Sequence, residues 1–212
     1  MFRSLIFVAS LSVVAAPFCA ADEIGVMGGF GTATNMTATA GGTSASAGFR
    51  PGAGVGVLLG RNGPHWFGGE FRYLFLFDSL KVSQGGTEAT FSGRSHLIHY
   101  DLLLHARPER SPIRPFIAGG GGFRWIEGTG AQQVFQPLSQ FALLTHTREI
   151  VALISAGAGV KFRLSSRLNF RMEVRDYISP GFTKVIAAPP GASLHGWIHE
   201  FVPLASLTFT FR

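Results

Sequence analysis

The residues with the greatest catalytic potential lie near the end of the sequence. Ser193, His195, His199 and Glu200 supply a hydroxyl, two imidazoles and a carboxylate within one short segment. A serine activated by a histidine can attack an ester or amide carbonyl, provided that the two side chains meet within hydrogen-bonding distance. Histidines at the edge of a strand are more commonly solvated than catalytic. We therefore assign no catalytic residues here.

A second group, His96, His99 and His105, could supply metal ligands. Side chains alternate between the two faces of a strand, so His96 has the opposite parity to the other two. This spacing does not place three imidazoles on one face, and we expect neither a metal site nor a cofactor. The glycine run 119–122 lacks the Lys and Ser or Thr that follow in a phosphate-binding loop, so strand packing explains it better.

The N-terminal segment has the features of a secretory signal peptide. Arg3 precedes an apolar run over 5–16, which is shorter than the about 20 residues that a membrane-spanning helix needs. We predict a cleavable signal peptide over residues 1–21 and a single domain over 22–212. Cys19 is the one cysteine of the sequence, so the mature protein would contain no disulfide and no thiolate ligand.

The charge distribution does not indicate a nucleic-acid-binding protein. Lys and Arg number 18 against 12 Asp and Glu, which gives a formal net charge of +6. These basic residues recur singly and do not form the stripe that nucleic-acid recognition needs. Hydrophobic residues make up 46% of the sequence and charged residues 14%. An exported chain of this composition must either bury a large core or face lipid.

The periodicity of the apolar residues favours β-strands throughout. In RLNFRMEVRDY (167–177) the apolar side chains occupy one parity and the charged side chains the other. Eight segments with such alternation are predicted as strands, at about 23–34, 48–60, 65–78, 89–106, 115–127, 148–164, 167–178 and 195–212. Long connections alternate with short turns between them. Eight antiparallel strands with long loops at one end and short turns at the other describe an outer-membrane β-barrel.

The four long connections have the composition of flexible loops, and they lie at 35–47, 79–88, 128–147 and 179–193. With the leader and the final strand LTFTFR (207–212), the pattern resembles the small eight-stranded outer-membrane proteins of the OmpA/OmpX-like β-barrel superfamily. One departure is the ending Phe211-Arg212, because such chains commonly finish on an aromatic residue.

The resemblance implies an all-β fold, an eight-stranded antiparallel up-and-down transmembrane β-barrel. It also implies a location in the outer membrane of a Gram-negative-type bacterium. The implied partners are outer-membrane lipids and the barrel-assembly and periplasmic chaperone machinery, with no nucleic acid among them.

Contact with lipid decides which parity faces inward, because a charged side chain on the lipid side costs about 2 to 4 kcal/mol at the midplane. The charged parity should line an interior that is only just wide enough for side chains to fill. The predicted interior charge network comprises Glu70, Arg72, Asp101, Arg124, Glu149, Lys161, Arg163, Arg171, Glu173, Arg175 and Glu200. The aromatic residues placed to form interfacial girdles are Phe67, Phe77, Trp125, Phe209 and Phe211.

We expect an integral outer-membrane protein that is not an enzyme and whose barrel is a structural or interaction scaffold of the cell envelope. The near-balance of buried cations and anions is what a closed, salt-bridged interior needs. Two alternatives are a narrow water or ion channel and a lipid-modifying enzyme. The enzyme would use the serine and histidines near strand eight, although the His-x-Ser order of the lipid A deacylase family is absent. A soluble lipocalin-like barrel is the remaining alternative, and it would place the apolar side chains inside and the charged side chains outside.

Overall fold

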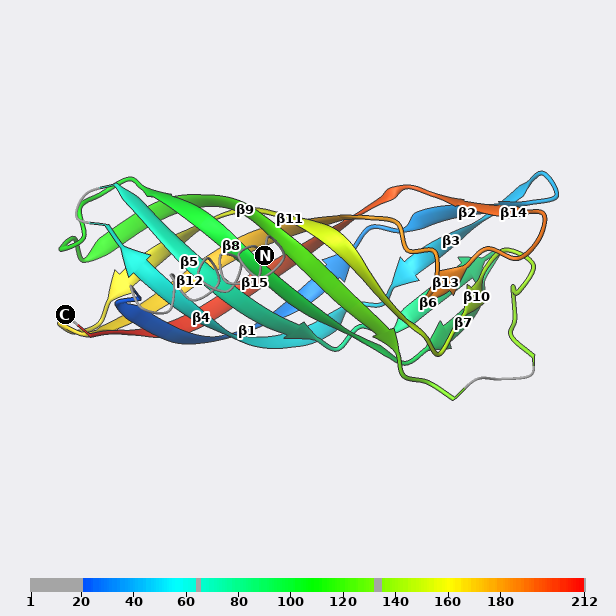
Figure 1. Cartoon of the computed structure of the whole chain (residues 1–212), viewed down its shortest axis with the longest axis horizontal. Helices are drawn as coiled ribbons and strands as arrows, with labels where there is room; N and C mark the ends of the chain where they lie inside the picture. Colours follow the sequence, from blue (N-terminus) through cyan, green and yellow to red (C-terminus); the bar gives the residue numbers. More distant parts are fainter. Residues whose placement is uncertain (1–20, 64–65, 132–134, 212) are drawn as a thin grey trace, which may run out of the picture.

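The chain folds into an elongated, almost entirely β-structured molecule (Figure 1). The computed structural model describes residues 21–63, 66–131 and 135–211, so nearly all of the predicted signal peptide lies outside the described residues. Eight strands form a closed antiparallel barrel in the order β1-β15-β12-β11-β9-β8-β5-β4. Within the described ranges, no helix is long and apolar enough to span a membrane.

The barrel strands match the eight predicted segments closely. They are β1 (Glu23–Ala33), β4 (Gly52–Asn62), β5 (Phe67–Leu76), β8 (Gly93–His105), β9 (Ile113–Gly128), β11 (Arg148–Arg163), β12 (Leu168–Pro180) and β15 (Trp197–Thr210). Each crosses the barrel with alternating exposed and buried side chains, as the period-two pattern requires. The first strand closes the barrel on the last, with Glu23 opposite both Gly60 of β4 and Thr210 of β15.

Short turns join the strands at one end of the barrel, which we call the turn end. The turn between β11 and β12 is closed by hydrogen bonds from the Leu164 and Ser165 amides to the Leu168 carbonyl, at 2.9 and 3.0 Å. The Ser165 hydroxyl oxygen also accepts the amide of Leu168 at 3.1 Å. In outer-membrane barrels the short turns face the periplasm and the long connections face the outside. The opposite end is the loop end.

The long connections are not flexible loops, and that expectation is wrong. They contain β2 (Met36–Ala40), β3 (Thr43–Phe49), β6 (Leu80–Gln84), β7 (Thr87–Phe91) and β14 (Ala192–His195), which pair in the order β14-β2-β3-β6-β7. A further pair joins β10 (Leu143–Leu144) to β13 (Ile186–Ala187). Together these seven strands form the loop-end extension, which stands beyond the barrel at the right of Figure 1.

Two Gly-Gly turns explain the hairpins of this extension. Gly41 and Gly42 connect β2 to β3 with φ of 55° and 78°, and Gly85 and Gly86 connect β6 to β7 with φ of 55° and 85°. Positive φ at both central residues is the geometry of a two-residue turn whose twist matches the twist of the flanking strands. Residues with side chains rarely adopt it, so glycine at both positions makes each connection a tight hairpin.

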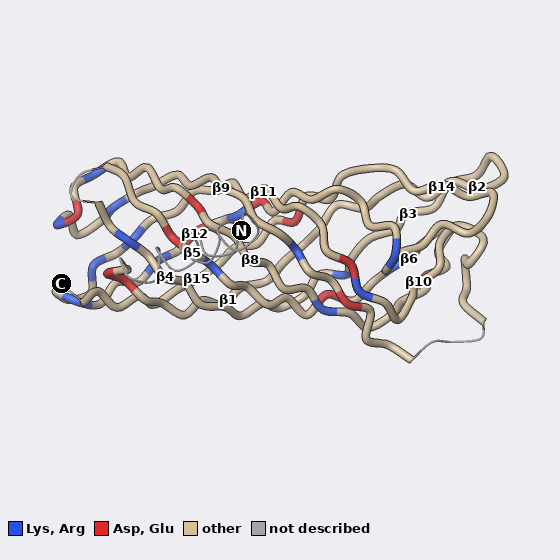
Figure 2. Tube along the Cα trace, in the orientation of Figure 1, with Lys and Arg blue, Asp and Glu red and all other residues tan. Residues whose placement is uncertain are grey.

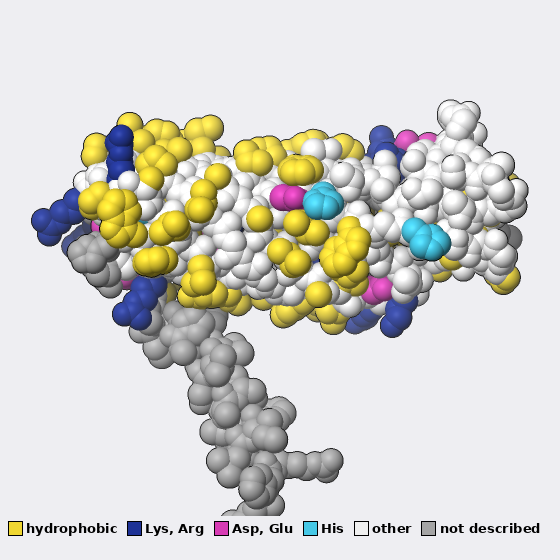
Figure 3. All heavy atoms as spheres, turned by 90° about the horizontal axis from the view of Figure 1, so that it is seen from above, with side chains coloured by type: hydrophobic (Ala, Val, Ile, Leu, Met, Phe, Trp, Pro, Cys, Tyr) yellow, Lys and Arg dark blue, Asp and Glu magenta, His cyan; other side chains and the backbone are white. Residues whose placement is uncertain are grey.

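The loop-end extension has an apolar core of its own. Phe49, Leu80, Val82 and Phe182 are buried there at 0 to 1% exposure, together with side chains from the loop ends of β9 and β15. On the face seen in Figure 3, hydrophobic side chains cover the wall of the barrel but are few on the extension, whose strands expose Thr, Ser and Lys side chains. The two parts therefore share one continuous chain but have opposite surfaces.

Candidate functional site

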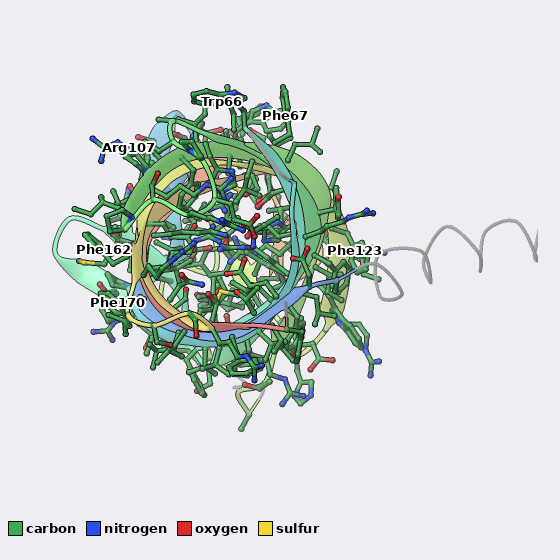
Figure 4. All side chains as sticks on the ribbon, turned by 90° about the vertical axis from the view of Figure 1, so that its left-hand side faces the viewer. Trp66, Phe67, Arg107, Phe123, Phe162 and Phe170 are labelled. Carbon is green, nitrogen blue, oxygen red and sulfur yellow. The ribbon has the colours of Figure 1, made fainter. Side chains whose placement is uncertain are left out.

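The lumen of the barrel contains a cluster of charged side chains with no access to solvent. We call it the central network, and its members are Glu70, Arg72, Asp101, Arg171, Glu173 and Arg175. Their side chains are 0 to 2% exposed. They come from β5, β8 and β12, so the ion pairs join strands that face one another across the lumen. In Figure 4, which looks in from the turn end, nitrogen and oxygen tips fill this space.

Glu173 is the centre of the network. Its carboxylate accepts hydrogen bonds from Arg171 at 2.7 Å and from Arg175 at 2.9 Å, and it also pairs with Arg72. Glu70 accepts two parallel hydrogen bonds from Arg171, at 2.6 and 2.9 Å, and a third from Arg175 at 2.7 Å. Parallel guanidinium–carboxylate bonds of this kind are strong and directional. The three arginines thus each contact both of these carboxylates.

Asp101 extends the network toward β8 and β11. It accepts a hydrogen bond from Arg175 at 2.7 Å and lies 3.1 Å from His99 Nδ1 and 3.4 Å from the Ser155 hydroxyl. Burying such charges is favourable only when partners satisfy them, since an isolated ion in this environment is strongly unfavourable. Each charged group of the central network lies within 2.9 Å of at least one group of opposite charge.

Glycines on the inner face make room for the large side chains. A Cβ added at Gly157 would lie 2.5 Å from Arg175 Cδ, and one at Gly159 would lie 2.6 Å from Glu173 Cβ. Both glycines are on β11, directly opposite these residues of β12 in the register. The glycines of β11 therefore leave the space that the long side chains of β12 occupy.

An apolar layer separates the central network from the loop end. On the inner face of β5, Leu74 and Leu76 follow Arg72, and on β8 Leu97 lies between Ser95 and His99. These leucines are fully buried and pack with Tyr177 and Val202. An ion that passed the central network would therefore meet a hydrocarbon section next.

A second charged group lies beyond this layer. Arg124 pairs with Asp78 at 2.6 Å and with Glu200 at 2.8 Å, and its Nη2 donates to the Ser95 hydroxyl at 3.0 Å. The guanidinium also lies 4.6 Å from the centroid of the Phe49 ring. Arg124 thus connects the top of the lumen to the core of the loop-end extension.

A third group occupies the turn end of the lumen. Lys161 Nζ donates to the Glu23 carboxylate at 2.9 Å and to the Asn62 side-chain oxygen at 3.1 Å. Arg114 donates to the same Asn62 oxygen at 3.2 Å. The lumen therefore holds three polar groups in succession and not one continuous network.

Two residues of the predicted interior charge network lie elsewhere. Glu149 is at the loop-end start of β11, where its carboxylate accepts the backbone amides of Thr183, at 3.1 Å, and of Lys184, at 2.8 Å. Arg163 is at the turn end and donates to the main-chain oxygen of Glu109. Both have the inward parity, but they lie at opposite ends of β11, where the strand extends past the closed part of the lumen. The parity of a residue shows whether its side chain points inward, but it does not show how far along the barrel the residue lies.

Three interior residues have no counterpart in the sequence prediction. Glu23 is the first residue of β1, Asp78 lies just after β5, and Arg114 lies at the beginning of β9. Each is at a strand end, which the sequence pattern defines poorly. Glu23 is the first residue of the predicted strand 23–34, whereas Arg114 lies one residue before the predicted strand 115–127.

Ser193 and His199, near strand eight, contact different parts of the structure. The Ser193 hydroxyl is 2.7 Å from the Thr39 hydroxyl, within the sheet of the extension. His199 Nδ1 is 2.9 Å from Asp176 on the outer wall, whereas Glu200 points inward to Arg124. The strand alternation thus places neighbouring residues on opposite sides of the barrel.

The three histidines of strand four are also separated. His96 is on the outer face, where its Nδ1 lies 2.8 Å from the Tyr73 hydroxyl, while His99 and His105 are buried inside. Across residues 21–63, 66–131 and 135–211, no group of three or more His, Cys, Asp or Glu side chains is arranged to hold a metal ion.

The aromatic residues predicted for the girdles lie on the outer wall near both ends. Phe67 is at the turn-end start of β5, and Phe209 and Phe211 lie at the turn end of β15. Phe77 and Trp125 are at the loop end. Figure 4 shows Phe67 pointing away from the barrel, as do Trp66, Phe162 and Phe170. Such rows of aromatic side chains mark the interfaces of a membrane-spanning barrel.

Comparisons with known proteins agree with this geometry. The model of the outer membrane protein beta-barrel domain family matches residues 5–184. The structure is similar to the outer membrane protein OprG of Pseudomonas aeruginosa, with 13% sequence identity, 91% of this chain and 97% of that chain covered, and a TM-score of 0.59.

A second similar structure is Neisserial surface protein A, with 10% identity, 89% of this chain and 97% of that chain covered, and a TM-score of 0.51. No curated protein sequence matches the chain. At these identities the structural likenesses show the fold alone.

The family match covers most of the chain, including seven of the eight barrel strands, and it agrees with the closed barrel and the inward charges. This protein therefore belongs to the outer membrane protein β-barrel domain family and resides in the outer membrane of a Gram-negative bacterium.

Proposed function

We propose that this protein is a non-conducting scaffold of the outer membrane that holds an ordered β-sheet extension at the cell surface. The observation that carries the proposal is the central network. Its arginine and carboxylate side chains meet across the lumen at 2.6 to 2.9 Å and are 0 to 2% exposed. An eight-stranded barrel has an interior just wide enough for side chains to fill, so a packed and paired interior leaves no path.

The succession of layers supports the same proposal. Beyond the central network, a permeating ion would have to cross the leucine layer around Leu74 and Leu97, and then the group around Arg124. Apolar constrictions oppose conduction because water and ions leave them. Breaking one polar group would therefore not open the barrel.

The loop-end extension supports an interaction role. Its hairpins are tied into one sheet, and Thr39 and Ser193 join two of its strands by a hydroxyl contact at 2.7 Å. A preformed surface loses less conformational entropy on binding than flexible loops do. The proposal includes no catalytic activity.

Conductance in planar lipid bilayers tests the scaffold proposal. The purified protein should give no steady single-channel openings under conditions in which a known porin conducts. Heat-modifiable migration on a detergent gel would establish that the inserted protein is folded. Reproducible openings of uniform size would overturn the proposal and favour a narrow channel.

A further inference from the structure

The turn end of the lumen opens into a cavity of about 290 Å³, which we call the turn-end cup. Four cationic side chains line it: Arg110, Arg114, Lys161 and Arg163. Among the described lining residues there is one carboxylate, that of Glu109. The cup therefore presents several positive groups to one small volume.

Three of the four cationic groups are held in place by the fold. Arg114 is 3% exposed, and its Nε donates to the main-chain carbonyl of Arg107 at 2.9 Å. Lys161 is 7% exposed and is fixed by Asn62 and Glu23. Arg163 is oriented by the main-chain oxygen of Glu109, which is a neutral acceptor. Fixed donors lose little freedom when a ligand binds, which favours affinity.

The charge of the turn end differs from that of the central network. The network has three cations and three anions, whereas the described residues at the turn end comprise seven cations and three carboxylates. The cations are Arg61, Arg107, Arg110, Arg114, Lys161, Arg163 and Arg167, and the carboxylates are Asp22, Glu23 and Glu109. Lys and Arg positions gather at this end in Figure 2. A concave site lined by one sign of charge concentrates ligands of the opposite sign.

We propose that the turn-end cup binds a phosphate- or carboxylate-bearing anion from the periplasmic side. Guanidinium groups match such oxyanions because they donate two parallel hydrogen bonds. A water molecule takes up about 30 Å³ in the liquid, so the cavity accommodates a group of roughly ten heavy atoms and not a polymer chain. The Lys161–Glu23 pair and the central network close the cup at its inner end. This anion-binding proposal does not depend on the proposal that the barrel is a non-conducting scaffold.

Two kinds of molecule can bring a phosphate group to this end of the barrel. One is a soluble anion, and the other is a lipid of the inner leaflet, through its headgroup. The cup residues lie at the mouth of the lumen, whereas Arg107 points outward from the barrel wall in Figure 4. Arg107 and Arg61, on the rim, provide a matched pair of cations outside the cup.

The test uses the full folded protein in a neutral detergent at low salt, titrated with inorganic pyrophosphate in a calorimeter. The wild type should bind it saturably. The double variant Arg110→Gln/Arg163→Gln should bind at least about tenfold more weakly, because two charge-assisted donors are lost. The control Arg61→Gln/Arg107→Gln removes the same charge from the rim and should bind as the wild type does.

Heat-modifiable migration verifies the fold of each variant. If the double variant does not fold, Arg110→Gln alone replaces it, because the Arg110 side chain is exposed. Repeating the titration in nanodiscs with anionic lipid identifies the source: reduced pyrophosphate binding assigns the cup to headgroups, and unchanged binding assigns it to soluble anions. Absence of saturable binding, or equal weakening by the rim control, would overturn the proposal.

Discussion

The barrel and the loop-end extension place the same kinds of residue on opposite sides. Val57 of β4 is 47% exposed on the lipid-facing wall, whereas Val82 of β6 is fully buried in the extension. Conversely, charged side chains fill the lumen, while polar side chains cover the outside of the extension. Strands in both regions alternate with the same period of two. The surrounding solvent, lipid or water, therefore decides which face becomes the inside.

Arg124 lies at the junction between the two arrangements. Its guanidinium pairs with carboxylates of the lumen and also lies near the Phe49 and Phe182 rings, with centroids 4.6 and 5.6 Å away. Arginine can combine these roles, because its planar cation pairs with carboxylates through its edge and stacks on aromatic rings through its face. The junction is thus polar on one side and aromatic on the other.

The largest effect is expected in the lumen, from Glu173→Leu. This change removes a carboxylate that three arginines share, and leaving buried charges without partners costs about 3 to 5 kcal/mol. Denaturant unfolding from detergent micelles measures the loss. Met172→Leu, one residue away on the lipid-facing side, is the control and should change the free energy of unfolding by less than about 1.5 kcal/mol. Equal stability of both variants would contradict the ion-paired interior.

The next effect is expected in the extension, from Leu80→Ala. Leu80 is fully buried in the apolar core, so the cavity should cost about 2 to 5 kcal/mol. Limited proteolysis should then cleave the extension while the barrel keeps its heat-modifiable migration. Lys81→Ala, on the opposite face of β6, should leave the protease pattern unchanged. Simultaneous loss of the barrel would show that the two cores fold as one unit.

The smallest effect is expected on the outer wall at the loop end, beyond the apolar belt. Glu127 pairs there with the half-exposed Arg94 at 2.6 Å, and the hydrogen bond from Arg94 lowers the pKa of Glu127. A lowered pKa stabilises the fold at neutral pH, and that contribution disappears as pH falls through the folded-state pKa.

Glu127→Gln should therefore lower the free energy of unfolding by less than about 1 kcal/mol at neutral pH. The difference from the wild type should shrink as pH falls through the lowered folded-state pKa of Glu127 and vanish where the carboxyl is protonated in both the folded and unfolded states. A difference that persists in acid would have to come from packing and not from charge.

The barrel could be predicted from the sequence because contact with lipid restricts which side chains the outer face can carry. Lipid-facing positions are mostly apolar, with the Asp176–His199 pair as an exception, and the inward positions are free to be charged. The parity of segments such as 167–177 therefore determines orientation. Glu70, Arg72 and Glu173 were predictable for this reason. Which carboxylate meets which arginine depends on the register between strands, and no feature of a single strand reveals it.

The loop-end extension could not be predicted from apolar content, because its strands are short and rich in Ala, Ser and Thr. The available signal was the Gly-Gly pair at 41–42 and again at 85–86, each flanked by alternating residues. The strand ends were the other weak point. Glu149 and Arg163 have the inward parity but lie outside the closed section of the lumen.

The seam between β1 and β15 joins the two ends of the sequence, since Glu23 lies opposite Thr210 and Met27 opposite Ser206. Until β15 is in place, β1 and β12 each present an unpaired edge of amides and carbonyls. Such edges are unstable in hydrocarbon and aggregate in water. A chain interrupted before residue 197 therefore lacks the strand that closes the barrel, and both of these edges stay unpaired.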